Sequence, residues 1–82
     1  MYVVRWKRTA LERVAELWLD SADRNRVTDA VAEIDRLLAI KPSAVGESRS
    51  EEVRVLFEPP LGVFYEFDES TRTVWVLKVW TF

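Results

Sequence analysis

The groups that commonly do chemistry in proteins are few in this sequence. None of its 82 residues is Cys or His, which excludes thiol nucleophiles, disulfides, zinc–thiolate sites and the most common general base. The remaining ionisable side chains are 12 Lys and Arg, 14 Asp and Glu, and two Tyr, with a formal net charge of −2. We therefore predict no metal site and no cofactor, and any reaction would depend on Arg, Lys, Tyr and carboxylate groups.

Basic residues gather near the start of the chain. A slightly acidic protein lacks the broad positive field that holds nucleic acid by its phosphates, but a local patch remains open. Such a patch would dock an acidic protein partner or nucleic acid. The alternative, which we favour, is a solvated strand end and helix start, partly neutralised by Glu12 and Glu16. The basic residues are Arg5, Lys7, Arg8 and Arg13.

The elements that would position these groups begin with a strand and a helix. Tyr2, Val4 and Trp6 alternate with residues that turn basic, as in a short strand with one apolar side. From Thr9, a candidate N-cap, the spacing becomes that of a helix running to about Leu19. Its predicted core-facing stripe is Leu11, Val14, Ala15 and Trp18, broadened by Leu17.

A second amphipathic helix follows the turn-forming residues 20–26. Ser21 or Asp23 can cap its start, and Lys41 with Pro42 ends it. Its apolar residues recur on one side over three turns: Val27, Ala30, Val31, Ile34, Leu37 and Leu38. Two such helices joined by a few residues form an antiparallel helical hairpin.

The C-terminal part has the period of two expected for strands. Three alternating runs, residues 53–57, 61–67 and 74–80, predict an antiparallel meander. Residues 43–52 are predicted as a loop or a short irregular edge strand. The order β-αα-βββ predicts one α+β domain, residues 1–82, with a small, mainly antiparallel sheet packed on the helical hairpin. The pattern leaves open which side of the meander the first strand joins.

The predicted sheet is apolar on both faces. Two helices can cover one face, so the other should expose aromatic and aliphatic groups, which monomers tolerate only over small areas. We expect a partner to cover this face. The alternative is that strong twist and the loop at residues 43–52 close it. The last strand is predicted to divide its side chains between the faces: Trp75, Leu77 and Val79 on one, Val74, Val76 and Trp80 on the other.

Targeting signals are not found in the sequence. There is no run of about 18 apolar residues, the length that a membrane helix requires. The first residues also lack the basic-then-apolar order of a signal peptide. We therefore expect a protein of the cytoplasm without a membrane segment.

Three stretches together resemble a known family over nearly the whole chain. YVVRWKRTALERVAELW is similar to that family's opening strand and first helix, and IDRLLAIKP to the end of its second helix. VRVLFEPPLGVFYEFDESTRTVWVLKVW is similar to its arginine-bearing strand, Y-x-φ-D strand end and V-x-V-L-x-V strand. The family is the RelE/ParE superfamily of type II toxin–antitoxin toxins, which includes plasmid-stabilisation proteins. The resemblance implies a small sheet packed on a helical hairpin.

The resemblance also implies a partner. Toxins of this family are neutralised by an antitoxin whose disordered C-terminal segment wraps the toxin and adds helix or strand to it. We therefore expect a cognate antitoxin on the open sheet face, and a homodimer is a further alternative. The residues expected to bind the partner are Leu61, Val63, Tyr65, Val74, Val76, Trp80 and Arg5.

RelE-type members resemble ribosome-dependent ribonucleases, and this implies candidates for RNA cleavage. Attack by the 2′-hydroxyl needs a base, a cation at the developing charge and an acid at the leaving oxygen. Each candidate also has a structural alternative: Arg54 pairs with Glu66 or only extends from the sheet, Tyr65 packs in the core edge, and Lys78 protects a sheet edge. The candidates are Arg49, Arg54, Tyr65 and Lys78, with Glu47 or Glu51 as base.

Two departures favour ParE-type members, which share the fold, lack the nuclease residues and bind DNA gyrase. Gly62 and Phe64 stand where active nucleases commonly place an arginine, and Trp80–Phe82 lacks their basic-aromatic tail. We therefore expect a ParE-like toxin that acts on a target such as gyrase. The alternatives are a RelE-like mRNA endoribonuclease acting on the ribosome, and a degenerate module that only binds its antitoxin or itself.

Overall fold

The computed structural model describes residues 1–50 and 52–82. The order of elements agrees with the predicted β-αα-βββ pattern, to which a helical turn and a two-residue strand are added between residues 42 and 48. The elements in chain order are β1 (Val3–Trp6), α1 (Arg8–Asp20), α2 (Arg24–Ile40), α3 (Pro42–Val45), β2 (Glu47–Ser48), β3 (Arg54–Glu58), β4 (Leu61–Asp68) and β5 (Thr73–Thr81). Strand β2 is the short edge strand that the sequence left as one of two alternatives.

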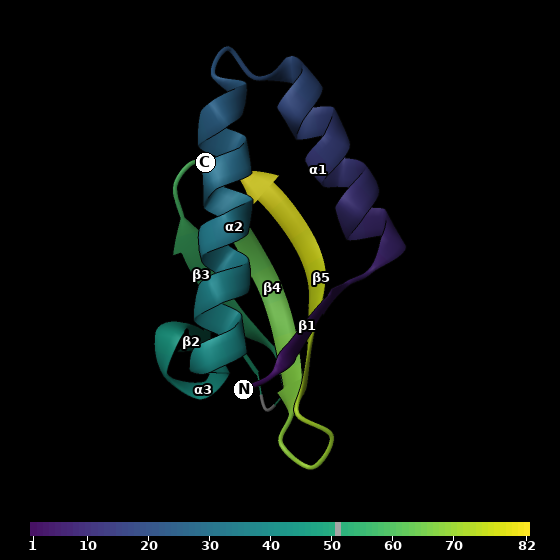
Figure 1. The fold of residues 1–82 in the computed structure, drawn as a ribbon, viewed down its shortest axis with the longest axis vertical. Coiled ribbons are helices and arrows are strands. Elements are labelled where there is room, and N and C mark those ends of the chain that lie inside the picture. Colours follow the sequence, from purple (N-terminus) through teal and green to yellow (C-terminus); the bar gives the residue numbers. More distant parts are fainter. Residues whose placement is uncertain (51) are drawn as a thin grey trace.

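All five strands form one sheet in the order β1-β5-β4-β3-β2 (Figure 1). Strand β1 runs parallel to β5, and the other neighbouring strands are antiparallel. The register places Val4 beside Val74 and Trp6 beside Val76, so the apolar side of β1 extends the apolar side of β5. This pairing decides the position of the first strand, which the sequence left open.

The helices cover one face of the sheet, as expected from an α+β domain of two layers. Helix α1 packs mainly on β5 and α2, and α2 contacts β1, β3 and β4; Figure 1 shows α2 in front of the sheet with α1 beside it. The core fills the space between the layers. Its buried residues are Ala10, Leu17, Val27, Ala30, Ile34, Leu38, Leu56, Leu61, Val63, Tyr65, Val74, Val76 and Val79.

Helix α2 follows the predicted pattern closely. The Asp23 side chain accepts a hydrogen bond from the backbone N–H of Arg26 (3.3 Å), which confirms Asp23 as the N-cap. The helix ends at Ile40, before Pro42. The Trp6 indole N–H donates to the Asp35 carboxylate (2.7 Å) and ties β1 to the middle of this helix.

Helix α1 is rotated relative to the predicted stripe. It begins at Arg8 after Lys7, without a side-chain cap, so the prediction that Thr9 caps it is wrong. Ala10 and Leu17 are buried, whereas Leu11 is 53% exposed. Ala15 and Trp18 are exposed as well. Because α1 carries apolar residues around most of its circumference, its sequence allows two stripes, and the fit of small Ala10 against the sheet selects the observed one.

A β-bulge in β5 changes which side chains share a face. Phe64 pairs with Lys78 but Tyr65 pairs with Val76, so Leu77 is an extra residue on β5. Val74 and Val76 before the bulge face the helices, as does Val79 after it. The prediction that Trp80 shares the face of Val74 and Val76 is therefore wrong. Periodicity gives no sign of the bulge because nearly every residue around it is apolar.

In the described residues, no helix has the length and apolar character needed to span a bilayer.

Candidate functional site

Two of the four candidate catalytic residues contact each other on the side of the sheet that faces the helices. Arg54 on β3 lies opposite Tyr65 on β4, and its Nε donates a hydrogen bond to the Tyr65 hydroxyl (3.3 Å). The Tyr65 hydroxyl in turn donates to the Pro42 carbonyl (2.6 Å). A second Arg54 nitrogen donates to the Gly46 carbonyl. These bonds close the α3–β2 segment onto the sheet.

The surroundings of Tyr65 suit a structural group. Its side chain is fully buried, and burial raises the pKa of the phenol, with the hydrogen bond from Arg54 acting in the opposite direction. The phenol therefore stays protonated at neutral pH, and its proton is directed at a main-chain carbonyl. Gly46 is required beside it, because a Cβ there would overlap the Tyr65 hydroxyl.

The other candidates lie apart from this pair. Lys78 is exposed opposite Phe64 on the face of the sheet away from the helices. Arg49 is in the exposed turn between β2 and β3, where its backbone N–H donates to the Val53 carbonyl (2.8 Å). Glu47 lies exposed on edge strand β2, and Glu51 lies outside the described residues. The candidate set is therefore not gathered at one point.

The alternative in which Arg54 pairs with Glu66 is wrong. Glu66 lies opposite Trp75 and one position beyond Tyr65, so it is on the other face of the sheet from Tyr65 and Arg54. The Arg54 guanidinium instead donates hydrogen bonds to the Tyr65 hydroxyl and the Gly46 carbonyl. This difference arises because alternation identifies two sets of side chains but not which set meets the helices.

Most residues expected to bind a partner belong to the core. Five of the seven are fully buried against the helical layer: Leu61, Val63, Tyr65, Val74 and Val76. Their expected position on the open face is wrong, because that strand side is the one that packs on α1 and α2. Trp80 and Arg5 do lie on the face away from the helices, which we call the open face.

One end of the open face is aromatic. We call the group Phe57, Phe64, Trp80 and Phe82 the aromatic end. The ring of Trp80 lies 4.7 Å from that of Phe64 and 6.1 Å from that of Phe57, centre to centre, and Phe57 lies 5.2 Å from Phe82. Phe57 and Phe82 remain 44% and 65% exposed. The prediction of exposed aromatic groups on the second face is thus confirmed at this end.

Gly62 allows the Trp80 ring to lie flat on the sheet. The two residues are paired across β4 and β5, and a Cβ on Gly62 would lie 2.7 Å from the indole ring. Any larger residue would push the ring away from the strand. A glycine inside a predicted strand, which often marks the close approach of another group, is the sequence signal at this end.

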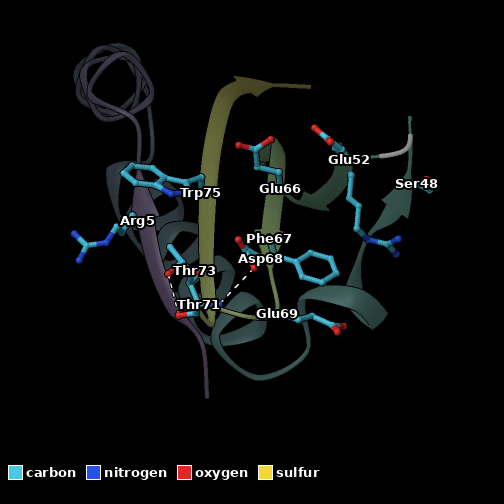
Figure 2. Close-up of a pocket in the computed structure, with 11 residues that line it drawn as sticks. Arg5, Ser48, Glu52, Glu66, Phe67, Asp68, Glu69, Thr71, Thr73 and Trp75 are labelled. Carbon is cyan, nitrogen blue, oxygen red and sulfur yellow. Dashed lines mark hydrogen bonds between the residues drawn. The ribbon is translucent and has the colours of Figure 1, made fainter.

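The other end of the open face borders a cleft with a volume of about 760 Å³, which we call the acidic cleft (Figure 2). Arg54 and Phe67 also line it, although their strand positions are on the helical side of the sheet. Figure 2 shows Arg5 and Trp75 on one side of it, and Glu66 and Glu52 on the other. Four carboxylates and two guanidinium groups line it, which leaves an excess of two negative charges. The lining residues are Arg5, Ser48, Glu52, Arg54, Glu66, Phe67, Asp68, Glu69, Thr71, Thr73 and Trp75.

The carboxylates of the acidic cleft form no ion pair among the described residues. The ion pairs among the described residues are Arg13–Glu16 and Arg36–Glu33, both on helices. Hydrogen bonds from Ser70 lower the pKa of Asp68 and favour its ionised form, and the bond from the Ser70 hydroxyl has the largest effect. Within residues 1–50 and 52–82, no cluster of acidic side chains is arranged to hold a metal ion. The cleft therefore has a negative field and would repel a phosphate group.

Comparisons with known proteins agree with this fold. Neither a family model nor a curated protein matches the sequence. Among solved structures, a chain of the toxin–antitoxin complex RelBE2 from Mycobacterium tuberculosis is 25% identical, with a TM-score of 0.78 over 99% of this chain and 98% of that chain. The chromosomal ParDE system of P. aeruginosa matches with 16% identity and a TM-score of 0.70, covering 99% of this chain and 96% of that chain.

The archaeal RelE–RelB complex from Pyrococcus horikoshii OT3 matches as well, with 14% identity and a TM-score of 0.67 over 98% of this chain and 93% of that chain. The similarity thus extends to both RelE and ParE structures and covers nearly the whole of each chain. The sheet order, the helical hairpin on one face and these matches lead to one conclusion. This chain has the fold of the RelE/ParE superfamily of type II toxin–antitoxin toxins.

Proposed function

We propose that this toxin acts in the ParE manner, by binding a protein target such as DNA gyrase, and that it does not cleave RNA. The placement of the candidate catalytic residues carries the proposal. The Tyr65 hydroxyl is buried on a main-chain carbonyl, and Lys78 is on the opposite face of the sheet. Cleavage requires a base, a cation and an acid around one phosphate. The described members of the candidate set offer no such point.

The charge of the open face supports the same proposal. The acidic cleft has more carboxylates than guanidinium groups. The anionic backbone of mRNA would be repelled there, whereas the aromatic end is typical of surfaces that bind proteins. The proposed partners are therefore proteins: an inhibited target and a cognate antitoxin that covers the open face. If the target is gyrase, the toxin would act in the cytoplasm.

Induced expression in bacterial cells tests the proposal. We expect growth arrest, loss of negative supercoiling in a reporter plasmid and intact mRNA, as measured by primer extension on ribosome-bound transcripts. Co-expression of the small protein encoded beside the toxin gene should restore growth. Cleavage of ribosome-bound mRNA by the purified protein would overturn the ParE-like mechanism. Normal growth at high expression would instead support a degenerate binding module.

A RelE-like endoribonuclease is the second candidate. The contact between Arg54 and Tyr65 and the similarity to RelE structures favour it. This candidate predicts that Arg54→Lys, which keeps the charge but loses the two-point hydrogen bonding, reduces mRNA cutting in the presence of ribosomes. If Arg54→Lys and the unmodified protein both leave mRNA intact, the nuclease reading is excluded.

A further inference from the structure

The open face has two chemically different ends on the same pair of strands. The aromatic end lies around Gly62 and Trp80, and the acidic cleft lies around Glu66 and Asp68. Asp68 is six positions beyond Gly62 on β4, a distance of about 20 Å at the rise of a strand. A ligand that covers this face must therefore satisfy aromatic groups at one end and negative charges at the other.

The acidic cleft is suited to the cationic side chains of a polypeptide. Trp75 on its wall is 37% exposed, and the ammonium group of Lys7 already lies 5.2 Å from the centre of its ring. A tryptophan beside carboxylates provides both a π-face and counter-charges for Lys or Arg. Because the described carboxylates are not arranged as metal ligands, an organic cation fits the cleft better than a metal ion.

We propose that a basic-apolar segment of the antitoxin occupies the open face, with Lys or Arg side chains in the acidic cleft and apolar side chains on the aromatic end. The inference rests on the proposed function, which supplies the antitoxin, and adds the chemistry of the segment. The distance between the ends sets the spacing. The basic and apolar groups are about six residues apart if the segment is extended, and about 13 if it is helical.

Other occupants fit this face less well. Nucleic acid would bring phosphates against four carboxylates. A second copy of this chain would place its own acidic cleft on either the acidic cleft or the aromatic end of the first, and neither arrangement pairs the charges. A basic segment satisfies both ends at once.

The probe is a phage-displayed library of random 16-residue peptides, selected on the purified full chain. We expect enriched peptides to combine Lys or Arg with apolar residues at one of the two spacings. The double variant Glu66→Gln/Glu69→Gln should lower the affinity for a selected fluorescent peptide about tenfold, as measured in an anisotropy titration. The matched control Glu12→Gln/Glu16→Gln removes the same charge from exposed α1 and should leave its affinity unchanged.

Each other result overturns the inference. Enriched peptides without excess basic residues, no enrichment, equal weakening by both double variants, or self-association through the open face would all contradict it. Circular dichroism confirms that the variants are folded. Growth arrest and its rescue are measured independently of the peptide selection. If no basic peptides are enriched but growth rescue is normal, the basic segment is rejected and the proposed function stands. If expression causes no growth arrest, the proposed function itself is rejected.

Discussion

At the scale of single residues, the buried phenol of Tyr65 shows how a candidate for catalysis becomes part of the framework. The hydroxyl donates to Pro42 and accepts from Arg54, and it is fully buried. A buried polar group contributes to stability only while it keeps such partners, since its removal leaves the other groups unsatisfied. We therefore assign Tyr65 to holding the α3–β2 segment on the sheet.

The first prediction concerns the loss of this hydroxyl. Tyr65→Phe should lower the free energy of unfolding by about 1–3 kcal/mol, because the Pro42 carbonyl loses its donor in a buried place. Urea denaturation followed by circular dichroism measures the change. Tyr2→Phe is the control. It should leave the free energy of unfolding the same, because the half-buried ring keeps its edge-on packing against Phe67. Equal stability of both variants would show that the Tyr65 hydrogen bonds contribute nothing.

The second prediction concerns alkaline pH. Burial raises the pKa of Tyr65 in the folded state above its ordinary value of 10.0. As the pH rises past 10, the unfolded chain loses the phenol proton first, so the folded state holds more protons and its stability decreases. Urea denaturation between pH 8 and pH 11 should show this decrease, and it should be smaller for Tyr65→Phe. Parallel curves for the two proteins would contradict the assignment.

At the scale of the elements, helix α1 and strands β4 and β5 decide which apolar residues are inside. Ala10 and Leu17 of α1 face the core, whereas Leu11 is exposed. The bulge at Leu77 and the close approach of Trp80 to Gly62 fix the two faces of β5 in the same way. Both features depend on contacts between elements and are invisible in the periodicity of either one.

The third prediction distinguishes the observed stripe of α1 from the expected one. Leu17→Ala should lower the free energy of unfolding by about 2–5 kcal/mol, because it leaves a cavity in the core. Leu11→Ala, the same chemical change on the exposed side, should change it by less than about 0.5 kcal/mol. Chemical denaturation measures both. The reverse order would mean that α1 packs through the stripe around Leu11.

The fourth prediction concerns the support of the aromatic end. Gly62→Ala should destabilise the fold by about 1–3 kcal/mol, because the new methyl group displaces the Trp80 ring. The cost should largely disappear when Trp80→Leu is present, since the obstructing ring is gone. A double-mutant cycle from urea denaturation measures this coupling. Additive effects of the two changes would show that the ring does not lie on Gly62.

At the scale of the whole molecule, the two layers separate the candidate groups instead of gathering them. Arg54 and Tyr65 are on the helical side, and Lys78 is on the open face. The same arrangement leaves the open face, with its aromatic end and acidic cleft, as the surface available to a protein. This separation of the candidate groups supports the proposed inhibition by binding.

The fifth prediction follows from this separation. Arg49→Ala/Lys78→Ala should keep growth arrest within about twofold of the unmodified toxin, because Lys78 lies on the other face of the sheet from Arg54 and Tyr65, and Arg49 lies in the exposed turn between β2 and β3. The dose of inducer that halves the growth rate is the measurement, with protein levels matched by immunoblot. The core variant Leu17→Ala serves as a control for loss of fold. Loss of growth arrest in the double variant, with its fold intact, would show that Arg49 or Lys78 takes part in the toxic activity.

Residue order by itself determined the type and succession of the elements, a cap at Ser21 or Asp23, the α+β class and the resemblance to RelE/ParE toxins. These follow from local spacing, which is fixed by the 3.6-residue turn of a helix and the alternation of a strand. Tertiary structure decided the rest: β1 beside β5, the rotation of α1, the bulge at Leu77, and the burial of Leu61 and Tyr65. The physical reason is that an apolar residue gains the same free energy on either side of a sheet, so only the packing of helices on one face selects the inside.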